Sequence, residues 1–337
     1  MKKFLSVLLV AALLLSAMTL LSCSNEDEQN RTVVGKVGSY DVYYEELRWL
    51  TMQYKDLYES SYGEGIWDNA ETAEKYRPEL ERSVYGAIVA NYAVLTLCDD
   101  ERLTLNGEKL IDINSATVQG LVDDYVNSTI DEAGGEMNYN KELKENYLTE
   151  SLYRFITGVD ICENLVFKQY CELGFIDDSN DAAYEYITNN FIRTKHIYIQ
   201  NDVKDSVADN KALAESVRVK LLNGEDLDEL ISNYSEDGYM SSENGYYFTH
   251  GQYSKAYEDA SFALNVGQVS EVIETFSGFY VITRLELDTG YIMLNLLTGL
   301  KDQYLLAVFD KYLEDCKATL QFTPNDYGSG LDLTKMK

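Results

Sequence analysis

Few side chains in this chain could carry metal or redox chemistry, since it has five cysteines and two histidines among 337 residues. Four cysteines follow Cys23 and show neither a C-x-x-C pair nor metal-ligand spacing to a histidine; they are Cys98, Cys162, Cys171 and Cys316. Two histidines nearly exclude histidine-based zinc chemistry, and we expect no metal or cofactor. Apolar helical patterns around Cys98 and Cys162 favour buried free thiols. An oxidising compartment would permit a disulfide, whose pairing the spacing does not select.

The N-terminal residues match the pattern of an export signal. Met1–Lys3 is short and basic, and a long apolar run follows it. The run ends in Leu20-Leu21-Ser22-Cys23, which resembles the lipobox of bacterial lipoproteins. The resemblance implies a leader over 1–22, a diacylated Cys23 and a polar tether over 23–32. The alternative is an uncleaved membrane anchor, because the run approaches the ~18 residues that span a bilayer.

The charge of the chain restricts its partners. Asp and Glu number 57 against 28 Lys and Arg, which gives a formal net charge of −29. Phosphate contacts need Lys and Arg, so we expect no nucleic-acid partner. Anionic membrane surfaces would repel the chain, so the lipid on Cys23 must provide the attachment. Electrostatic complementarity favours basic or neutral partners.

The two ends of the chain have a helical texture. A strand pair is expected over 33–42, and the helices that follow are expected over 43–59, 70–99, 114–133 and 149–173. A further helix is expected to follow the polar capping stretch 177–181 and to run to about 190. Pro78 is a candidate first turn of the second helix, and Thr149 is a candidate N-cap. Near the C-terminus, a single amphipathic helix is expected over 293–319.

The middle of the chain alternates strands and helices. Strands are expected over 195–199, 272–276 and 279–285, with helices over 210–223, 227–234 and 257–264. The fold class is therefore α+β. We expect a helical domain formed by both chain ends, 33–190 and 289–337, with an α+β domain inserted over 191–288.

Residues 193–286 resemble the parvulin family of peptidyl-prolyl isomerases. Seven pieces occur in the family's order, among them Lys195-His196-Ile197-Tyr198-Ile199, Tyr234-Ser235-Glu236-Asp237, Phe248-Thr249-His250-Gly251-Gln252-Tyr253, Tyr257 to Leu264 and Ser277 to Ile282. The whole architecture also resembles the group of exported foldases and chaperones that includes PrsA and SurA. In that group a helical chaperone domain built from both chain ends contains an inserted parvulin domain.

The parvulin resemblance implies two sets of site residues. The polar, catalytic positions are His196, Asp237, Ser277 and Tyr280. The positions that bind the substrate around the proline ring are Tyr246, Phe248, Tyr253, Tyr257 and Phe262. The sequence departs from the family at Tyr253, Tyr257 and Tyr280, where Met, Phe and a second His are usual.

An X-Pro bond isomerises slowly because its partial double bond must twist, and a site that binds the twisted amide best accelerates it. The resemblance therefore implies a lipid-anchored peptidyl-prolyl isomerase on the outer face of the bacterial cell membrane. Its partners would be unfolded or nascent secreted polypeptides with X-Pro bonds. The alternative is a non-catalytic holdase whose parvulin domain only binds peptides. The 28 tyrosines of the chain would suit such a binding surface.

Overall fold

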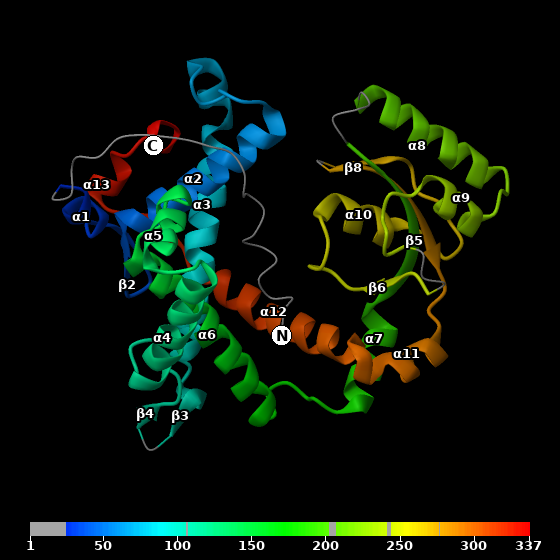
Figure 1. The fold of residues 1–337 in the computed structure, drawn as a ribbon. Helices are drawn as coiled ribbons and strands as arrows, with labels where there is room; N and C mark the ends of the chain where they lie inside the picture. The colour runs from blue at the N-terminus through cyan, green and yellow to red at the C-terminus, as the bar shows by residue number, and fades with distance from the viewer. Residues whose placement is uncertain (1–24, 106, 202–206, 241–243, 276) are drawn as a thin grey trace.

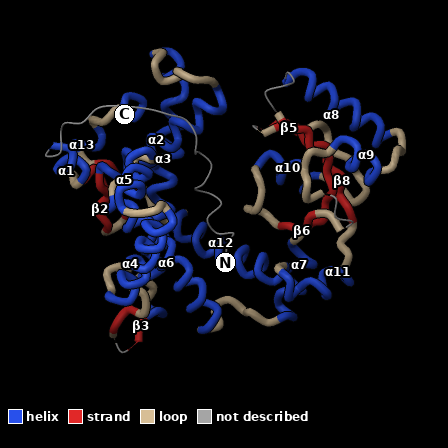
Figure 2. The backbone as a smooth tube through the Cα atoms, viewed as in Figure 1, coloured by secondary structure: helices blue, strands red, loops and turns tan. Residues whose placement is uncertain are grey.

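The computed structural model describes residues 25–105, 107–201, 207–240, 244–275 and 277–337. The expected leader and Cys23 lie outside the described residues. The fold is α+β, with a sheet-containing region inserted between helical segments from both ends of the chain (Figures 1 and 2). Among the residues that the structure describes, none of the helices is both long and apolar enough to cross a membrane.

The N-terminal helices share one hydrophobic core. They are α2 (Tyr44–Tyr62), α3 (Ala70–Cys98), α4 (Ala116–Glu132), α5 (Glu136–Glu145) and α6 (Glu150–Glu172), and the short helix α1 (Asn25–Asn30) precedes them. Leu80, Val84 and Ile88 recur at helical spacing on α3, and all three are fully buried. A short hairpin, β3 (Thr104–Leu105) with β4 (Glu108–Lys109), precedes α4. Helix α1 lies within the stretch 23–32 expected to be a polar tether.

Two expectations about the N-terminal helices have different outcomes. Thr149 is confirmed as an N-cap, since its hydroxyl accepts the Leu152 N–H at 3.0 Å. Pro78 as the first turn of its helix is wrong, because α3 begins at Ala70 and contains Pro78. The Asn69 side chain accepts the N–H groups of Glu71 and Thr72, so the helix already has its cap nine residues before the proline.

The two ends of the chain meet in one small sheet. Strands β1 (Val33–Val37), β2 (Tyr40–Tyr43) and β9 (Phe322–Pro324) pair antiparallel in the order β2-β1-β9. The short helix α13 (Asp326–Ser329) packs on β1. Beyond it, the ammonium group of Lys55 on α2 donates to the carbonyl oxygens of Thr334 and Met336 at 3.0 and 2.7 Å. The C-terminal residues are therefore part of the helical region.

The inserted region is built on a four-stranded antiparallel sheet. Its strands are β5 (Ile192–Gln200), β6 (Tyr246–Phe248), β7 (Ile273–Thr275) and β8 (Gly278–Leu285), in the order β6-β5-β8-β7. Helices α8 (Val207–Leu222) and α9 (Leu227–Tyr234) cover one face, and α10 (Lys255–Ala263) covers the other (Figure 1). Because strand side chains alternate, Ile197 and Ile199 face α8 and α9, whereas His196 and its partner Ile282 face α10.

The joint between the two regions is apolar. It is formed by α7 (Asn180–Asn190), α11 (Thr289–Asn295) and α12 (Leu300–Lys317), and its buried residues include Ile187, Phe191, Ile292, Leu300 and Tyr304. The expected single helix over 293–319 is wrong, since a 3-10 turn at 296–298 and Gly299 separate α11 from α12. Gly299 has φ of 122°, a value that a continuous α-helix does not allow.

Gly328 permits α13 to approach β1, and substitution there tests the closure of the chain ends. A Cβ atom at this position would lie 2.0 Å from the Val34 carbonyl oxygen. We expect Gly328→Ala to lower the free energy of unfolding of the helical region by about 1–3 kcal/mol. Urea unfolding followed by tryptophan fluorescence measures this, because both tryptophans, Trp49 and Trp67, lie in that region. Gly86→Ala, in open space on α3, is the control and should leave stability unchanged or raise it by up to ~1 kcal/mol.

Candidate active site

His196 is the central side chain of a hydrogen-bonded network under α10. Its side chain is 3% exposed, with Nε2 3.0 Å from Asp237 Oδ2 and Nδ1 2.9 Å from the Tyr257 hydroxyl oxygen. An ionised carboxylate only accepts, so in the neutral ring Nε2 carries the proton and Nδ1 accepts from Tyr257. The Thr194 hydroxyl lies 3.0 Å from the Tyr257 oxygen and can donate to it. The network thereby satisfies every polar atom of the buried ring.

Asp237 joins this network from the loop after α9. Its Oδ2 also accepts the Tyr246 hydroxyl at 2.9 Å, while Oδ1 accepts the Tyr239 N–H at 2.9 Å. The hydrogen bond from His196, followed by those from Tyr239 and Tyr246, lowers the pKa of Asp237 to about 2. Asp237 therefore both caps a turn and supplies a carboxylate to the network.

A cavity of about 300 Å³ opens beside His196. It is lined by His196, Asp237, Tyr246, Tyr253, Ser254, Tyr257, Thr275, Ser277 and Tyr280. Seven of these nine were expected from the sequence, and the structure brings them together from β5, β6, β8, α10 and the connecting loops. Ser254 and Thr275 were missed, although each directly adjoins a residue or turn of the family pattern.

Phe248 and Phe262 stand behind the wall of the cavity. Phe248 is fully buried and meets Tyr253 edge-on, with ring centroids 4.8 Å apart. Phe262 packs edge-on against Phe248 and stacks on the exposed ring of His250. The sequence pattern located both rings in this region but could not separate lining residues from supporting ones.

Four tyrosine rings define the character of the cavity. Tyr253 is 41% exposed at its mouth, whereas Tyr257 is 3% exposed. Tyr280 stacks on Tyr198 at 4.5 Å between centroids and meets the His196 ring edge-on at 5.1 Å. Burial raises the pKa of Tyr253 to about 12 and raises the pKa values of Tyr246, Tyr257 and Tyr280. The phenols are therefore neutral donors at physiological pH.

The turn that carries Tyr253 is fixed by Glu258, a residue that the sequence pattern did not single out. Glu258 is 7% exposed, and its carboxylate accepts the N–H groups of Gly251, Gln252 and Tyr253 at 2.7–3.0 Å. The Glu258 carboxylate on α10 thus fixes the backbone that positions the Tyr253 ring at the cavity. Among the described residues, no group of three or more His, Cys, Asp or Glu side chains is arranged to hold a metal ion.

Comparisons with known proteins match the inserted region and, at lower identity, most of the chain. A family model described as a PPIC-type PPIase domain matches residues 184–287. A foldase protein PrsA of Caldanaerobacter subterraneus is 24% identical over 284 residues, which cover 82% of this chain and 81% of that protein. Foldase protein PrsA 3 of Bacillus anthracis is 36% identical over 96 residues, 25% of this chain and 34% of that protein. The crystal structure of foldase protein PrsA from Streptococcus pneumoniae has 17% identity and a TM-score of 0.35, covering 73% of this chain and 85% of that one.

The inserted region is thus a parvulin domain of the PPIC type, placed between helical segments from both ends of the chain. Beyond this domain, the chain is similar to PrsA foldase proteins, in one case over most of its length.

The depressed pKa of Asp237 predicts how the stability of the inserted region depends on pH. The folded-state pKa of about 2 lies below the ordinary 3.8, so this stabilisation is complete above about pH 4 and is lost as the pH falls through about 2. We expect Asp237→Asn to cost about 2 kcal/mol at pH 7 and to flatten the dependence between pH 4 and 2. Hydrogen exchange of β5 and β8 peptides at pH 7, 4 and 2.5 measures this region alone.

The matched control for this measurement is Asp259→Asn. Asp259 belongs to an exposed pair with Lys255 on α10, so its loss should change stability by less than about 0.5 kcal/mol. Equal effects of the two substitutions would contradict the role given to Asp237.

Proposed function

We propose that this chain is a membrane-anchored foldase that isomerises X-Pro bonds of unfolded secreted polypeptides outside the cytoplasmic membrane. The observation that carries the proposal is the coincidence of the PPIC-type match at 184–287 with the cavity around His196. In this proposal, 191–288 is the isomerase domain. The helical domain formed by 33–190 and 289–337 holds the client chain.

The cavity suits a reaction that needs binding rather than bond breaking. Prolyl isomerisation has a barrier of ~18–20 kcal/mol, and lowering it by ~4 kcal/mol would give about a thousandfold acceleration. The rings of Tyr253 and Tyr257 would contact the proline ring. The hydroxyl groups of Ser277 and Tyr280, which line the same cavity, would stabilise the twisted amide.

In this mechanism His196 is a positioning residue. Its two ring nitrogens hold Tyr257 and Asp237 on opposite sides, and its own side chain is almost fully buried. The neutral phenols serve as hydrogen-bond donors, so the usual second histidine is not needed for proton transfer. Replacement of that histidine by Tyr280 keeps a donor at the cavity wall.

A second candidate function is a holdase in which the cavity binds peptides but does not catalyse isomerisation. Tyr246 favours the holdase, because the parvulin resemblance implies an apolar residue in this part of the cavity wall. The Tyr246 hydroxyl instead donates a hydrogen bond to Asp237. This arrangement makes the slot narrower and more polar than an aliphatic side chain would. The two functions differ in a single observable, the rate of isomerisation.

The two histidines of the chain provide a matched pair of variants for that rate. Loss of the His196 network would release Tyr257 and Asp237, so we expect His196→Ala to lower kcat/KM for a prolyl tetrapeptide at least tenfold. His250 is exposed outside the cavity, and His250→Ala should keep the wild-type rate. The measurement is cis–trans isomerisation of the peptide by the purified chain, with circular dichroism showing that both variants are folded.

Two outcomes would count against the isomerase. Wild-type chain that does not exceed the uncatalysed rate, while still preventing aggregation of an unfolded client, would favour the holdase. Equal rates for the His196→Ala and His250→Ala variants would place catalysis elsewhere.

The proposed lipid on Cys23 makes a separate prediction. We expect Cys23→Ser to move the chain from the membrane fraction to the soluble fraction of the cell envelope, because the acyl chains would supply the membrane affinity. Cys171→Ser, which changes a free cysteine of α6, is the control and should stay with the membrane. A Cys23→Ser chain that still sediments with membranes would refute the lipid anchor.

A further inference from the structure

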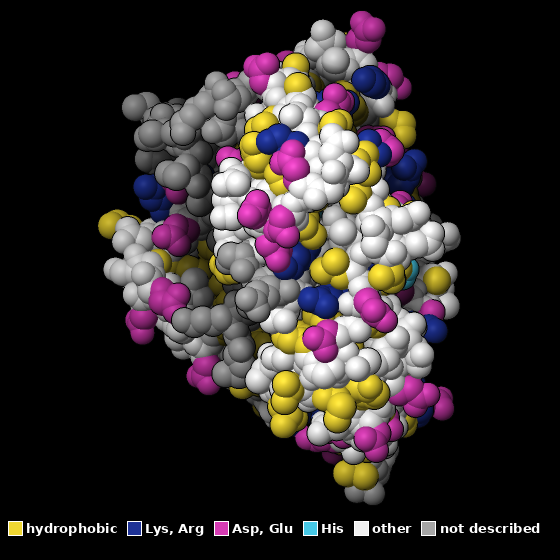
Figure 3. Space-filling view, turned by 90° about the vertical axis from the view of Figure 1, so that its right-hand side faces the viewer, with side chains coloured by type: hydrophobic (Ala, Val, Ile, Leu, Met, Phe, Trp, Pro, Cys, Tyr) yellow, Lys and Arg dark blue, Asp and Glu magenta, His cyan; other side chains and the backbone are white. Residues whose placement is uncertain are grey.

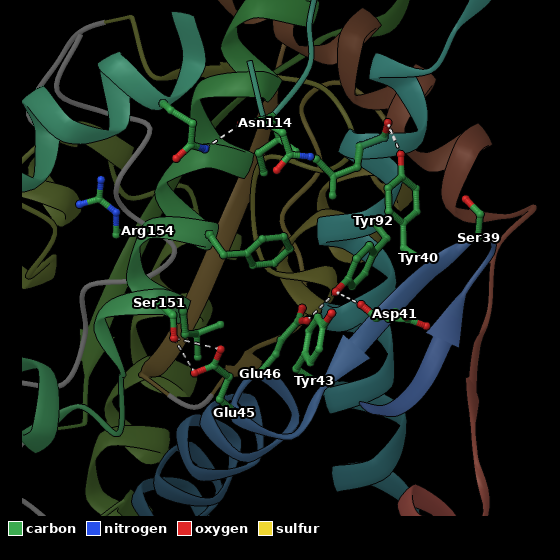
Figure 4. A pocket seen from close by; sticks show the side chains of 15 residues that line it. Ser39, Tyr40, Asp41, Tyr43, Glu45, Glu46, Tyr92, Asn114, Ser151 and Arg154 are labelled. Carbon is green, nitrogen blue, oxygen red and sulfur yellow. Dashed lines mark hydrogen bonds between the residues drawn. The ribbon is translucent and has the colours of Figure 1, made fainter. Parts of the chain in front are cut away.

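A second cavity lies in the helical region and has a volume of about 540 Å³, compared with about 300 Å³ for the candidate active site. It opens where β2 meets α2, and α3, α6 and the segment before α4 complete its wall (Figure 4). The volume falls in the range of ligand sites and suits a long side chain with its adjoining backbone.

The lining of this cavity combines aromatic rings with carboxylates. The rings are Tyr40, Tyr43, Tyr92 and Phe155, and the carboxylates are Asp41, Glu45 and Glu46. Figure 4 shows the polar ends of Glu46, Tyr43 and Tyr92 turned toward one another. Glu45 points toward the start of α6, where it accepts from Ser151 at 2.9 Å and from Thr149 at 2.5 Å.

The positive charges near the cavity are already engaged. Arg154, its one cationic lining residue, pairs with Asp123 and lies 3.8 Å from Glu150. Asp41 pairs with Lys36 at 2.7 Å. Among the described residues, neither Glu45 nor Glu46 forms an ion pair. The cavity therefore presents two glutamate side chains that have no cationic partner among the described residues.

The hydrogen-bond partners of Glu46 accommodate both its protonated and its ionised form. Its carboxyl group is 2% exposed and accepts from Asn91 Nδ2 at 3.0 Å. The Tyr92 hydroxyl oxygen lies 2.9 Å from Glu46 Oε2 and 3.0 Å from the Asp41 carbonyl oxygen. Since a hydroxyl group has one proton, Tyr92 donates to Glu46 when that carboxyl group is ionised, and it can donate to the Asp41 carbonyl when Glu46 supplies a proton of its own.

The groups around Glu46 oppose its ionisation. Burial raises the pKa of Glu46 to about 7, partly offset by the hydrogen bonds from Asn91 and Tyr92 on α3. The other titratable or charged groups that face the cavity are Glu45 on α2, Tyr40 and Asp41 on β2, Tyr43 at its end and Arg154 on α6. A cation that entered the cavity would favour the ionised carboxylate.

We propose that this cavity binds a basic side chain of an extended polypeptide, with the ionised carboxylate of Glu46 as its partner. The aromatic rings would cover the aliphatic stem of the side chain and contribute cation–π attraction. The choice of a polypeptide rests on the proposed foldase function, and the net charge of −29 favours basic segments of such clients. On the face in Figure 3, acidic, basic and apolar side chains are interspersed. The lining of the pocket, in contrast, groups carboxylate side chains with aromatic rings.

Binding of the cation is coupled to loss of the Glu46 proton. Below its pKa the proton competes with the ligand, so affinity rises with pH until Glu46 is ionised in the free protein. With a pKa of about 7, the affinity should increase about tenfold from pH 6 to pH 8. The Tyr92 hydroxyl then turns its proton from the Asp41 carbonyl to the Glu46 carboxylate.

Calorimetric titration of the purified full chain tests the proposal. The probe is acetyl-Gly-Leu-Arg-Leu-Gly-amide, which has no proline, and its partner carries neutral citrulline in place of arginine. At pH 8 we expect the citrulline peptide to bind at least tenfold more weakly. Glu46→Gln should lower the affinity for the arginine peptide at least tenfold at pH 8 and abolish the difference between pH 6 and pH 8.

Two controls separate this site from the rest of the protein. Glutamine reproduces the donor and acceptor of neutral Glu46, so Glu46→Gln should stay folded and keep the wild-type isomerase rate. Glu64→Gln removes the same charge at an exposed loop position and should leave peptide binding unchanged.

Three results would overturn the proposal. The first is equal affinity for the arginine and citrulline peptides, and the second is an unchanged pH dependence in the Glu46→Gln variant. The third is equally tight binding of acetyl-arginine-amide alone, which would show that the ligand is a small guanidinium compound and not a polypeptide. Because the isomerase rate is measured on the same chain, failure of this binding with isomerisation intact would overturn this proposal alone.

Discussion

The burial of one imidazole ring is the constraint on which the candidate site depends. His196 lies on the strand face under α10, where an unpartnered ring nitrogen would cost about 1–3 kcal/mol. Asp237 and Tyr257 satisfy both nitrogens, and they come from a loop after α9 and from α10. The positions of α10 and of the loop after α9 are therefore both linked to hydrogen bonds with the same ring. Glu258 adds a second anchor, because it holds the turn that brings Tyr253 over the opening.

The helical region depends on a different interaction, the pairing of the two chain ends. Strand β9 pairs with β1, and the backbone near Met336 accepts the buried ammonium group of Lys55. Helix α12 then connects this core to the joint with the inserted region, with Phe309 and Leu313 in one core and Leu300 and Tyr304 in the other. The inserted region thus extends from a helical region whose two chain ends are paired, and the cavity at Glu46 lies within that helical region.

Alternation and motif order made much of the fold predictable. The strands expected over 195–199 and 279–285 correspond to β5 and β8, and the polar residues His196, Asp237, Ser277 and Tyr280 were brought together as the family pattern implied. The break at Gly299 was missed because apolar residues continue on both sides of it at helical spacing. Phe248 and Phe262 were placed in the site because sequence order does not show depth, and Glu258 was missed because its role is to accept backbone N–H groups. The cavity at Glu46 had no local signal, since its walls come from segments over one hundred residues apart.

The central claim is that His196 holds the prolyl-binding cavity together through Asp237 and Tyr257. The most direct measurement is ¹⁵N nuclear magnetic resonance of the imidazole rings at pH 8, where only His196 and His250 contribute. The account predicts that His196 carries its proton on Nε2, and that an X-Pro tetrapeptide shifts the His196 signals but not those of His250. A proton on Nδ1, or His196 signals that do not respond to the peptide, would contradict it.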